Sequence, residues 1–299
     1  MRCRPTLLLC SALFPAWLGA CRSDGERARP GRYLESGLLD VAEEARRQLG
    51  VTLPPARETA SRLTALAVAA RRVVGDERGP AAVVELNEFF FGRAGFRREV
   101  ADRDLRFLLL PRVLENRRGS CLGLAGLYLV LARRLGLPVN GVLVPGHFFL
   151  RLGEGPGHVN IELLRKGENM PEEWYRHRWQ VPPAAGAYLR ALEDDETLAV
   201  LHFNLGNEYR RRGHLRRALR HYRRAVEDFP DFAEAQASLG LAFQLLGQRR
   251  RALAAYRRAL GLQPGLPGLQ GNLAVLLGEM SAPVSAATTP EQQQPRQQQ

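Results

Sequence analysis

The stretch that decides the fold is VLENRRGSCLGLAGLYLVLARRLG, residues 113–136. From Cys121 to Ala132 the sequence is apolar almost all round, and charge returns only in the last turn, before Gly136. A helix without a polar face is buried on all sides, and basic residues followed by glycine are typical of a helix C-terminus. The sequence therefore predicts a buried central helix over 121–135.

Helical periodicity precedes this central helix, and strand patterns follow it. The predicted helices are 33–49, 56–75, 80–91 and 102–116, and the predicted strands are 139–144, 147–152 and 158–164. A Pro145-Gly146 turn joins the first two strands. Helices that precede a short antiparallel sheet indicate an α+β domain, which we place at residues 33–198.

From residue 199 the sequence becomes repetitive, with a period of 34 residues. The positions that recur are Leu205, Gly206, Tyr209, Gly213, Ala218, Tyr222, Ala225 and Pro230. This pattern resembles the tetratricopeptide repeat, in which small residues let two helices approach and aromatic residues fill the space between them. The predicted α-helical repeats are 199–232, 233–266 and a partial 267–280. So few repeats are not expected to stand alone, and we expect them to pack on the preceding domain.

The two ends of the chain are predicted to lie outside the folded part. Residues 1–20 have basic residues followed by an apolar run too short to span a bilayer, which indicates a signal peptide. Leu18-Gly19-Ala20-Cys21 resembles a bacterial lipobox, which implies acylation of Cys21 and an exported, membrane-anchored lipoprotein on the periplasmic or cell-surface side. Residues 21–32 are the expected flexible tether, and residues 281–299 the expected disordered tail.

The composition bounds the class of protein. The chain has 299 residues, of which 45% are hydrophobic and 25% charged, and this excludes wholesale disorder and a polytopic membrane protein. The net charge is +12, but Lys166 is the only lysine. We attribute the excess of arginine to codon bias and expect no nucleic-acid partner. The arginine-rich face of residues 210–224 is either a solvated surface or a contact for anionic lipid or an acidic partner.

Cysteine usage isolates one thiol. Cys3 and Cys10 belong to the predicted signal peptide and Cys21 to the lipobox, so Cys121 alone remains in the mature protein. Exported proteins usually use cysteines in pairs. The Cys121 thiol is therefore either buried and inert or a reactive group that takes part in catalysis.

The position of Cys121 favours the reactive alternative. Gly119-Ser120-Cys121 places the sulfur at the start of the central helix, where free N–H groups and the helix dipole stabilise a thiolate. His147 begins a predicted strand, and Asn160 and Glu162 alternate onto one face of the next. We predict the strand register that puts His147 and Glu162 on the same side, so that a base and its orienting group lie beside the thiol.

These residues resemble a known family. The run Val113 to Cys121, the helix that ends at Gly136-Leu137-Pro138, and Pro145-Gly146-His147-Phe148 are similar to the SirB1-type transglutaminase-like family, over roughly residues 86–192. The resemblance implies a papain-like core with a Cys-His-Asp type triad, in which Cys121 is the nucleophile and His147 the base. Glu162 stands where relatives often have aspartate, so either Glu162 or Asn160 is the third member.

The remaining site assignments are simpler. The backbone N–H of Cys121 is the default oxyanion donor, and Asn116 is a second candidate. We expect no metal and no cofactor, although His147 and His158 flank one hairpin. Trp174, Tyr175 and Trp179 form either core packing or a substrate wall.

Two functions follow from these expectations. The first is a membrane-anchored cysteine hydrolase or acyltransferase that acts on peptide or protein amides and binds its protein partner through the repeats. The alternative is a non-catalytic periplasmic scaffold or assembly factor with the same fold. The substrate and the oligomeric state are not determined by the sequence.

Overall fold

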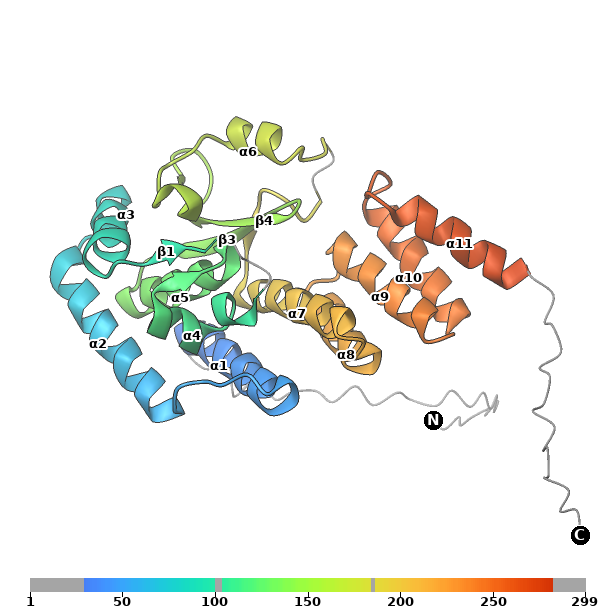
Figure 1. Cartoon of the computed structure of the whole chain (residues 1–299). Coiled ribbons are helices and arrows are strands. Elements are labelled where there is room, and N and C mark those ends of the chain that lie inside the picture. The colour runs from blue at the N-terminus through green and yellow to red at the C-terminus, as the bar shows by residue number, and fades with distance from the viewer. Residues whose placement is uncertain (1–29, 100–103, 184–185, 282–299) are drawn as a thin grey trace, which may run out of the picture.

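A computed structural model describes residues 30–99, 104–183 and 186–281 (Figure 1). The predicted signal peptide, Cys21 and the predicted tail after residue 281 lie outside the described residues. Helix α1 (Pro30–Leu49) begins within the segment predicted as a tether. The α+β class is confirmed, since helices surround a small antiparallel sheet and a helical segment follows.

The N-terminal helices surround α5, whose residues from Leu122 to Ala132 are all buried. Ser120 caps its start and Gly136 ends it in the left-handed conformation, with φ of 76°. The elements before the main sheet are α2 (Ala56–Val74), α3 (Pro80–Asn87), a π-helical turn at Glu88–Arg93, β1 (Arg97–Arg98), a 3-10 helix η3 (Leu105–Phe107), α4 (Leu110–Asn116), β2 (Arg118–Gly119) and α5 (Cys121–Leu135).

One predicted helix was too long. The sequence suggested a helix over 102–116, but α4 begins at Leu110 and is preceded by the short η3. Pro111 lies in the first turn of α4, where its missing N–H costs nothing, and it cannot sit inside a longer helix without breaking a hydrogen bond.

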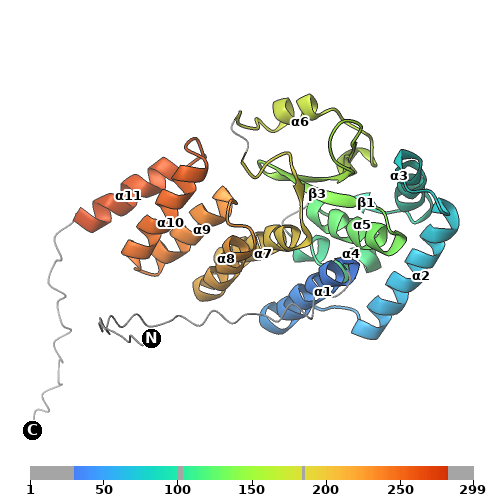
Figure 2. The same cartoon turned by 180° about the vertical axis from the view of Figure 1, so that it is seen from behind.

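The main sheet has the strand order β5-β4-β3-β6, with every pair antiparallel. Its strands are β3 (Val139–Val144), β4 (His147–Leu152), β5 (Val159–Ile161) and β6 (Ala191–Leu192). In both Figure 1 and Figure 2, α5 lies on one side of this sheet and α6 (Glu172–Arg178) on the other. The predicted strand 158–164 ends early, at Ile161, because the next residue caps a 3-10 turn at Leu163–Arg165.

The repeat helices pack through the residues that define the period. A Cβ added to Gly206 would lie 2.7 Å from the Tyr222 ring, and one added to Gly240 would lie 2.6 Å from the Tyr256 ring. Glycine is therefore required at both positions, because a tyrosine of the next helix lies too close to the backbone to leave room for a side chain. The helices are α7 (Asp194–Arg211), α8 (Leu215–Asp228), α9 (Ala233–Leu245), α10 (Arg249–Leu262) and α11 (Leu269–Ser281).

As expected, the repeats pack on the preceding domain. Gly37 of α1 lies so close to α7 that an added Cβ would be 2.5 Å from the Leu198 side chain. Arg133 at the end of α5 forms an ion pair of 2.9 Å with Asp194 at the start of α7. The first repeat helix is thus part of the body that holds the sheet, while α9 to α11 extend away from it (Figure 1).

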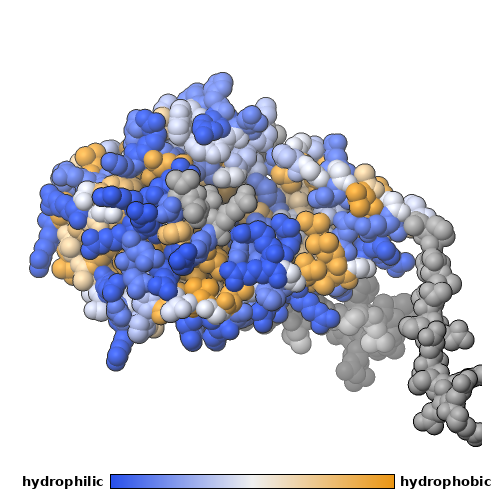
Figure 3. Space-filling model, in the orientation of Figure 1, coloured by the Kyte–Doolittle hydropathy of each residue, from blue (hydrophilic) through white to orange (hydrophobic). Residues whose placement is uncertain are grey.

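The surface is mainly polar. The face shown in Figure 3 is largely hydrophilic, with separate hydrophobic patches. Within the described part of the chain, no helix combines the length and the hydropathy needed to cross a bilayer.

Candidate active site

The start of α5 holds Cys121 in a fixed position. The Ser120 hydroxyl accepts a hydrogen bond of 3.1 Å from the Gly123 N–H, and the Ser120 N–H donates to the Phe107 carbonyl at 2.7 Å. A Cβ on Gly123 would lie 2.1 Å from that carbonyl oxygen, so only glycine fits here. Cys121 is the first helical residue and is partly exposed. Its sulfur therefore lies at a helix end whose first N–H groups have no intrahelical acceptor.

His147 begins β4, directly after the turn at Gly146, whose φ is 70°. The imidazole Nε2 lies 2.9 Å from Glu162 Oε2, and Cys121 is close enough to the ring to raise the pKa of His147. Because Nε2 faces the glutamate, Nδ1 is the ring nitrogen left to face the sulfur. The histidine thus connects a thiol to a carboxylate.

Glu162 orients the histidine from a fully buried position. Leu150 pairs with Ile161, and this register puts His147 and Glu162 on the same side of the sheet, one step apart diagonally. Glu162 Oε2 faces the imidazole, while Oε1 accepts a hydrogen bond of 2.8 Å from the Leu164 N–H. The extra methylene of glutamate, compared with aspartate, is accommodated because the strand ends and turns at this residue.

The surroundings favour the charged imidazolium. Burial by itself lowers the pKa of His147, but its hydrogen bonds to Cys121 and Glu162, together with their negative charges, outweigh burial and raise the pKa to about 9. A positive charge therefore lies beside the sulfur at neutral pH. Such a charge stabilises the reactive, anionic form of a thiol.

Trp179, which is predicted to form either core packing or a substrate wall, stacks directly on the His147 ring. The Trp179 and His147 rings are parallel within 6°, with centroids 4.1 Å apart. Tyr175 of α6 stacks on Phe149, with centroids 3.7 Å apart. Desolvation and then the charge of Glu162 raise the pKa of Tyr175, so its hydroxyl stays neutral. These rings shield one side of the histidine–glutamate pair from water.

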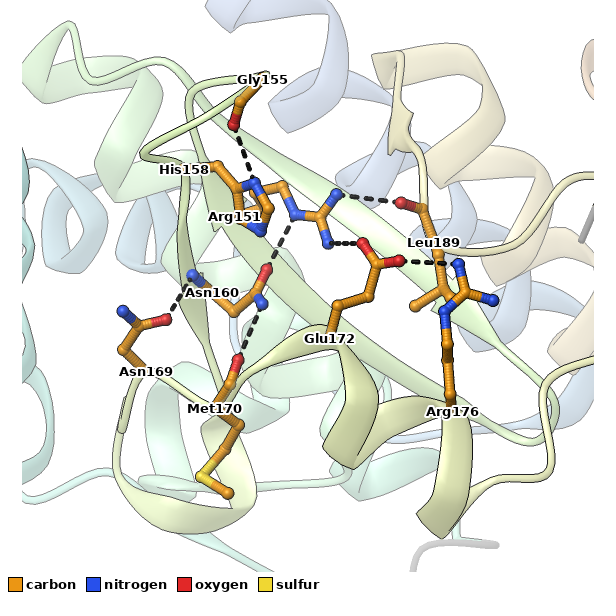
Figure 4. Close-up of polar contacts among 9 residues, drawn as sticks. All are labelled: Arg151, Gly155, His158, Asn160, Asn169, Met170, Glu172, Arg176 and Leu189. Atoms are coloured by element: carbon orange, nitrogen blue, oxygen red, sulfur yellow. Dashed lines mark hydrogen bonds and ion pairs between the residues drawn. The ribbon is translucent and has the colours of Figure 1, made fainter.

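Asn160 does not take part in the histidine chain. Its Oδ1 accepts a hydrogen bond of 2.8 Å from Arg151 Nε, and its Nδ2 donates to the Met170 carbonyl, also at 2.8 Å (Figure 4). Arg151 in turn contacts Glu172 Oε2 at 3.4 Å and donates to the Leu189 carbonyl at 2.9 Å. Asn160 therefore holds in place the segment that precedes α6, through its hydrogen bond to Met170. Of the two candidates for the third member of the triad, the structure places Glu162 beside His147.

Asn116 is also not brought to the sulfur. It is an exposed residue at the end of α4 and does not line the cavity next to Cys121. The chain reverses directly after it through Arg117, which has a φ of 54°. The backbone N–H groups at the start of α5 remain the donors available to an oxyanion at this site.

The sulfur and the imidazole open into a cavity of about 500 Å³. Cys121 and His147 line it from the transglutaminase-like side, and Phe203, Asn207 and Arg210 line it from α7. Phe232 and Glu234, at the start of α9, close the far side. The cavity is thus built jointly by the sheet domain and the first two repeats, and it has the size of a small-ligand or short-peptide site.

No cluster suited to a metal ion is found among the described residues. His158 lies 3.0 Å from the Gly155 carbonyl through Nδ1 (Figure 4).

Comparison with known proteins agrees with this architecture. The model of the transglutaminase-like superfamily matches residues 57–199, and two tetratricopeptide-repeat models match residues 206–247 and 233–265. The crystal structure of menin aligns over 84% of this chain and 68% of its own, with 11% identity and a TM-score of 0.38. That similarity does not define a common fold.

Related sequences carry the name UPF0162. One from Xylella fastidiosa (strain 9a5c) is 32% identical over 121 residues, which are 40% of this chain and 41% of the relative. One from Pseudomonas aeruginosa is 35% identical over 102 residues, 33% of this chain and 38% of the relative. YchA of Escherichia coli K12 is 28% identical over 122 residues, 39% of this chain and 45% of the relative.

The chain thus spans about two fifths of the length of the curated relatives it matches. The family resemblance stated from the sequence is confirmed: the chain has a transglutaminase-like domain followed by tetratricopeptide repeats, and its homologues are the UPF0162, or SirB1-like, proteins.

Proposed function

We propose that this protein is a cysteine-dependent hydrolase or acyltransferase that acts on amides of peptides or proteins. The observation that carries the proposal is the grouping of Cys121, His147 and Glu162: the thiol and the imidazole line one open cavity, and the imidazole is hydrogen-bonded to the buried carboxylate. A nucleophile, a base and an orienting group in this order are the parts that acyl transfer requires.

In the proposed reaction, the Cys121 thiolate attacks the amide carbonyl carbon. The oxyanion is stabilised by the N–H groups at the start of α5. The His147 imidazolium gives its proton to the leaving nitrogen, so that an amine departs and a thioester remains on Cys121. Water or an amine then attacks the thioester, His147 accepts its proton, and the thiolate leaves. Glu162 holds the imidazole in place through both half-reactions.

The repeats supply the binding surface in this proposal. Tetratricopeptide repeats indicate a role in protein interaction, and here α7 lines the same cavity as the sulfur. A protein bound along α7 would therefore have a segment beside Cys121.

Thiol alkylation tests the proposal directly. Protein beginning at Arg22 retains one cysteine, Cys121, and every described helix and strand. It should still react with iodoacetamide on the acid side of neutrality, because the His147 imidazolium beside the sulfur favours the thiolate. His147→Ala should lose this acid-side reactivity. Glu162→Gln, which keeps the shape of the side chain, should reduce it while near-ultraviolet circular dichroism remains native.

A thiol that reacts with an ordinary profile in both the parent protein and His147→Ala would contradict the proposal. The chain would then act as a non-catalytic scaffold that uses its repeats to bind proteins. The Cys121→Ser variant is the control for the site of labelling. It should not be alkylated, and alkylation of this variant would show that the label is not on Cys121.

We also propose that Cys21 is acylated after export, which would tether the protein to a membrane. The lipobox-like run that ends at Cys21 supports this part. Mass spectrometry of the N-terminal peptide should show a diacylglyceryl adduct, and Cys21→Ser should abolish it and release the protein from the membrane fraction. Unmodified Cys21 in the mature protein would contradict it.

A further inference from the structure

The polar side chains of α7 are arranged in order along the cavity. Val200, Phe203, Asn204, Asn207 and Arg210 all line the cavity, and they follow one another in this order along α7. From Val200 to Arg210 the helix rises by about 15 Å, which is the length of four to five residues of an extended chain. The α7 face thus changes from apolar to amide to cationic over the length of a short peptide.

The two asparagines offer complementary hydrogen-bonding groups. Asn204 donates through Nδ2 to the Val200 carbonyl at 2.8 Å, which leaves its Oδ1 as the group that can accept. The Asn207 Oδ1 accepts from the Tyr222 hydroxyl at 2.8 Å, which leaves its Nδ2 as the group that can donate. One acceptor and one donor on adjacent turns match the N–H and C=O of a peptide backbone.

The carboxylates that line the cavity already have partners. Asp104 is paired with Arg106 at 2.6 Å, and Glu208 is bonded to Arg212 at 2.5 Å. Glu234 accepts a hydrogen bond of 2.5 Å from a tyrosine hydroxyl. Asp104 and Glu208 are thus paired with arginines, and burial raises the pKa of Glu234, which disfavours its charged form.

Arg210 is different, because no ion pair joins it to a carboxylate of the described residues. Its guanidinium lies beside the Tyr222 hydroxyl, and its Nε is buried without a hydrogen-bond partner. A carboxylate is the acceptor that a guanidinium binds most strongly. Arg210 lines the cavity, so a carboxylate bound there would meet a guanidinium that no carboxylate of the described residues already pairs.

We infer that the cavity takes an extended peptide segment with an apolar side chain near Val200 and Phe203 and a carboxylate at Arg210. This inference rests on the proposed function, since it places such a segment beside Cys121. Asn204 and Asn207 hold the peptide backbone between these two ends. The substrate class is therefore an acidic peptide or protein segment.

Binding measured without turnover tests this assignment. The probe is a series of blocked, fluorescently labelled decapeptides, each with one leucine and one aspartate separated by two to six residues in either order. In the Cys121→Ser protein beginning at Arg22, fluorescence anisotropy should give at least about tenfold tighter binding for the best-placed aspartate than for alanine or lysine at that position.

Variants of α7 make the test specific. Arg210→Gln should remove the preference for aspartate, and Arg210→Glu should transfer it to lysine, a gain that an unfolded protein cannot show. Arg216→Gln, an equal charge change on an exposed residue outside the cavity, should leave the preference intact. Asn204→Ala should weaken all peptides alike, because it removes a backbone contact.

Equal binding of aspartate, alanine and lysine peptides, or an aspartate preference that survives Arg210→Gln, would overturn the inference. Its failure is distinguishable from failure of the proposed function. Peptide preference is measured with the sulfur removed, whereas the proposed function is tested by alkylation of that sulfur.

Discussion

Replacing Glu162 by glutamine should lower the pKa of His147. Glu162 contributes both a hydrogen bond and a negative charge that favour the imidazolium. Glutamine keeps the shape of the side chain and the acceptor for the Leu164 N–H, but carries no charge. Burial of the ring, which lowers the pKa of His147, is then opposed only by Cys121.

The expected magnitude follows from the raised pKa. A change from 6.5 to about 9 corresponds to about 3 kcal/mol of preference for the charged ring in the folded state. Because the folded pKa lies above the unfolded one, this stabilisation is complete below pH 6.5 and is lost as pH rises through about 9. In Glu162→Gln the pKa of His147 should fall by at least about one unit, and the loss of stability with rising pH should shrink in proportion.

Nuclear magnetic resonance of labelled histidine side chains measures the pKa directly. The His147 signal is assigned as the one missing in His147→Asn, and Glu154→Gln, a substitution of an exposed glutamate, serves as the charge-matched control. A parent pKa near 6.5, or a pKa near 9 that is unchanged in Glu162→Gln, would refute the reasoning that the carboxylate holds the imidazolium.

Repeat packing, the stacked ring and a half-buried histidine each give a further expected outcome. Gly206→Ala puts a methyl group 2.7 Å from a tyrosine ring and should lower the free energy of unfolding in urea by about 1–3 kcal/mol, whereas Gly261→Ala, with open space around it, should not. Trp179→Leu exposes His147 to water and removes part of the burial that lowers the pKa of His147, so this pKa should rise; an unchanged value in the same magnetic-resonance titration would contradict this. Burial, followed by repulsion from a second histidine, lowers the pKa of His202 to about 4, so stability should decline as pH falls from 6.5 to 4, by up to about 3 kcal/mol, and His202→Asn should flatten this decline.

The sequence predicted those parts of the fold that depend on local pattern. The helix 121–135 has the bounds of α5 because an uninterrupted apolar run lies between a serine cap and a left-handed glycine. The repeats were identifiable because Gly206 and Gly240 meet equivalent tyrosines at a fixed period. The pairing of His147 with Glu162 followed from strand alternation once one register was chosen.

Features that depend on contacts between distant segments could not be predicted. Nothing local to Trp179 indicates that it stacks on His147, because α6 is positioned by the contacts of Asn160 and Arg151 with the segment before it. For the same reason Asn160 looked equivalent to Glu162 in sequence. Both alternate onto one face, and only the bound arginine distinguishes their roles.

The sharing of one cavity wall by α7 has a practical consequence for dissecting this protein. A cut between the sheet domain and the repeats, placed before Asp194, would remove Val200 and Phe203 from beside the thiol and uncover the glycine of α1 against which Leu198 packs. Neither fragment would reproduce the behaviour of the whole. Chimeras between relatives should therefore be joined after α9, so that every element that lines the cavity comes from the same parent.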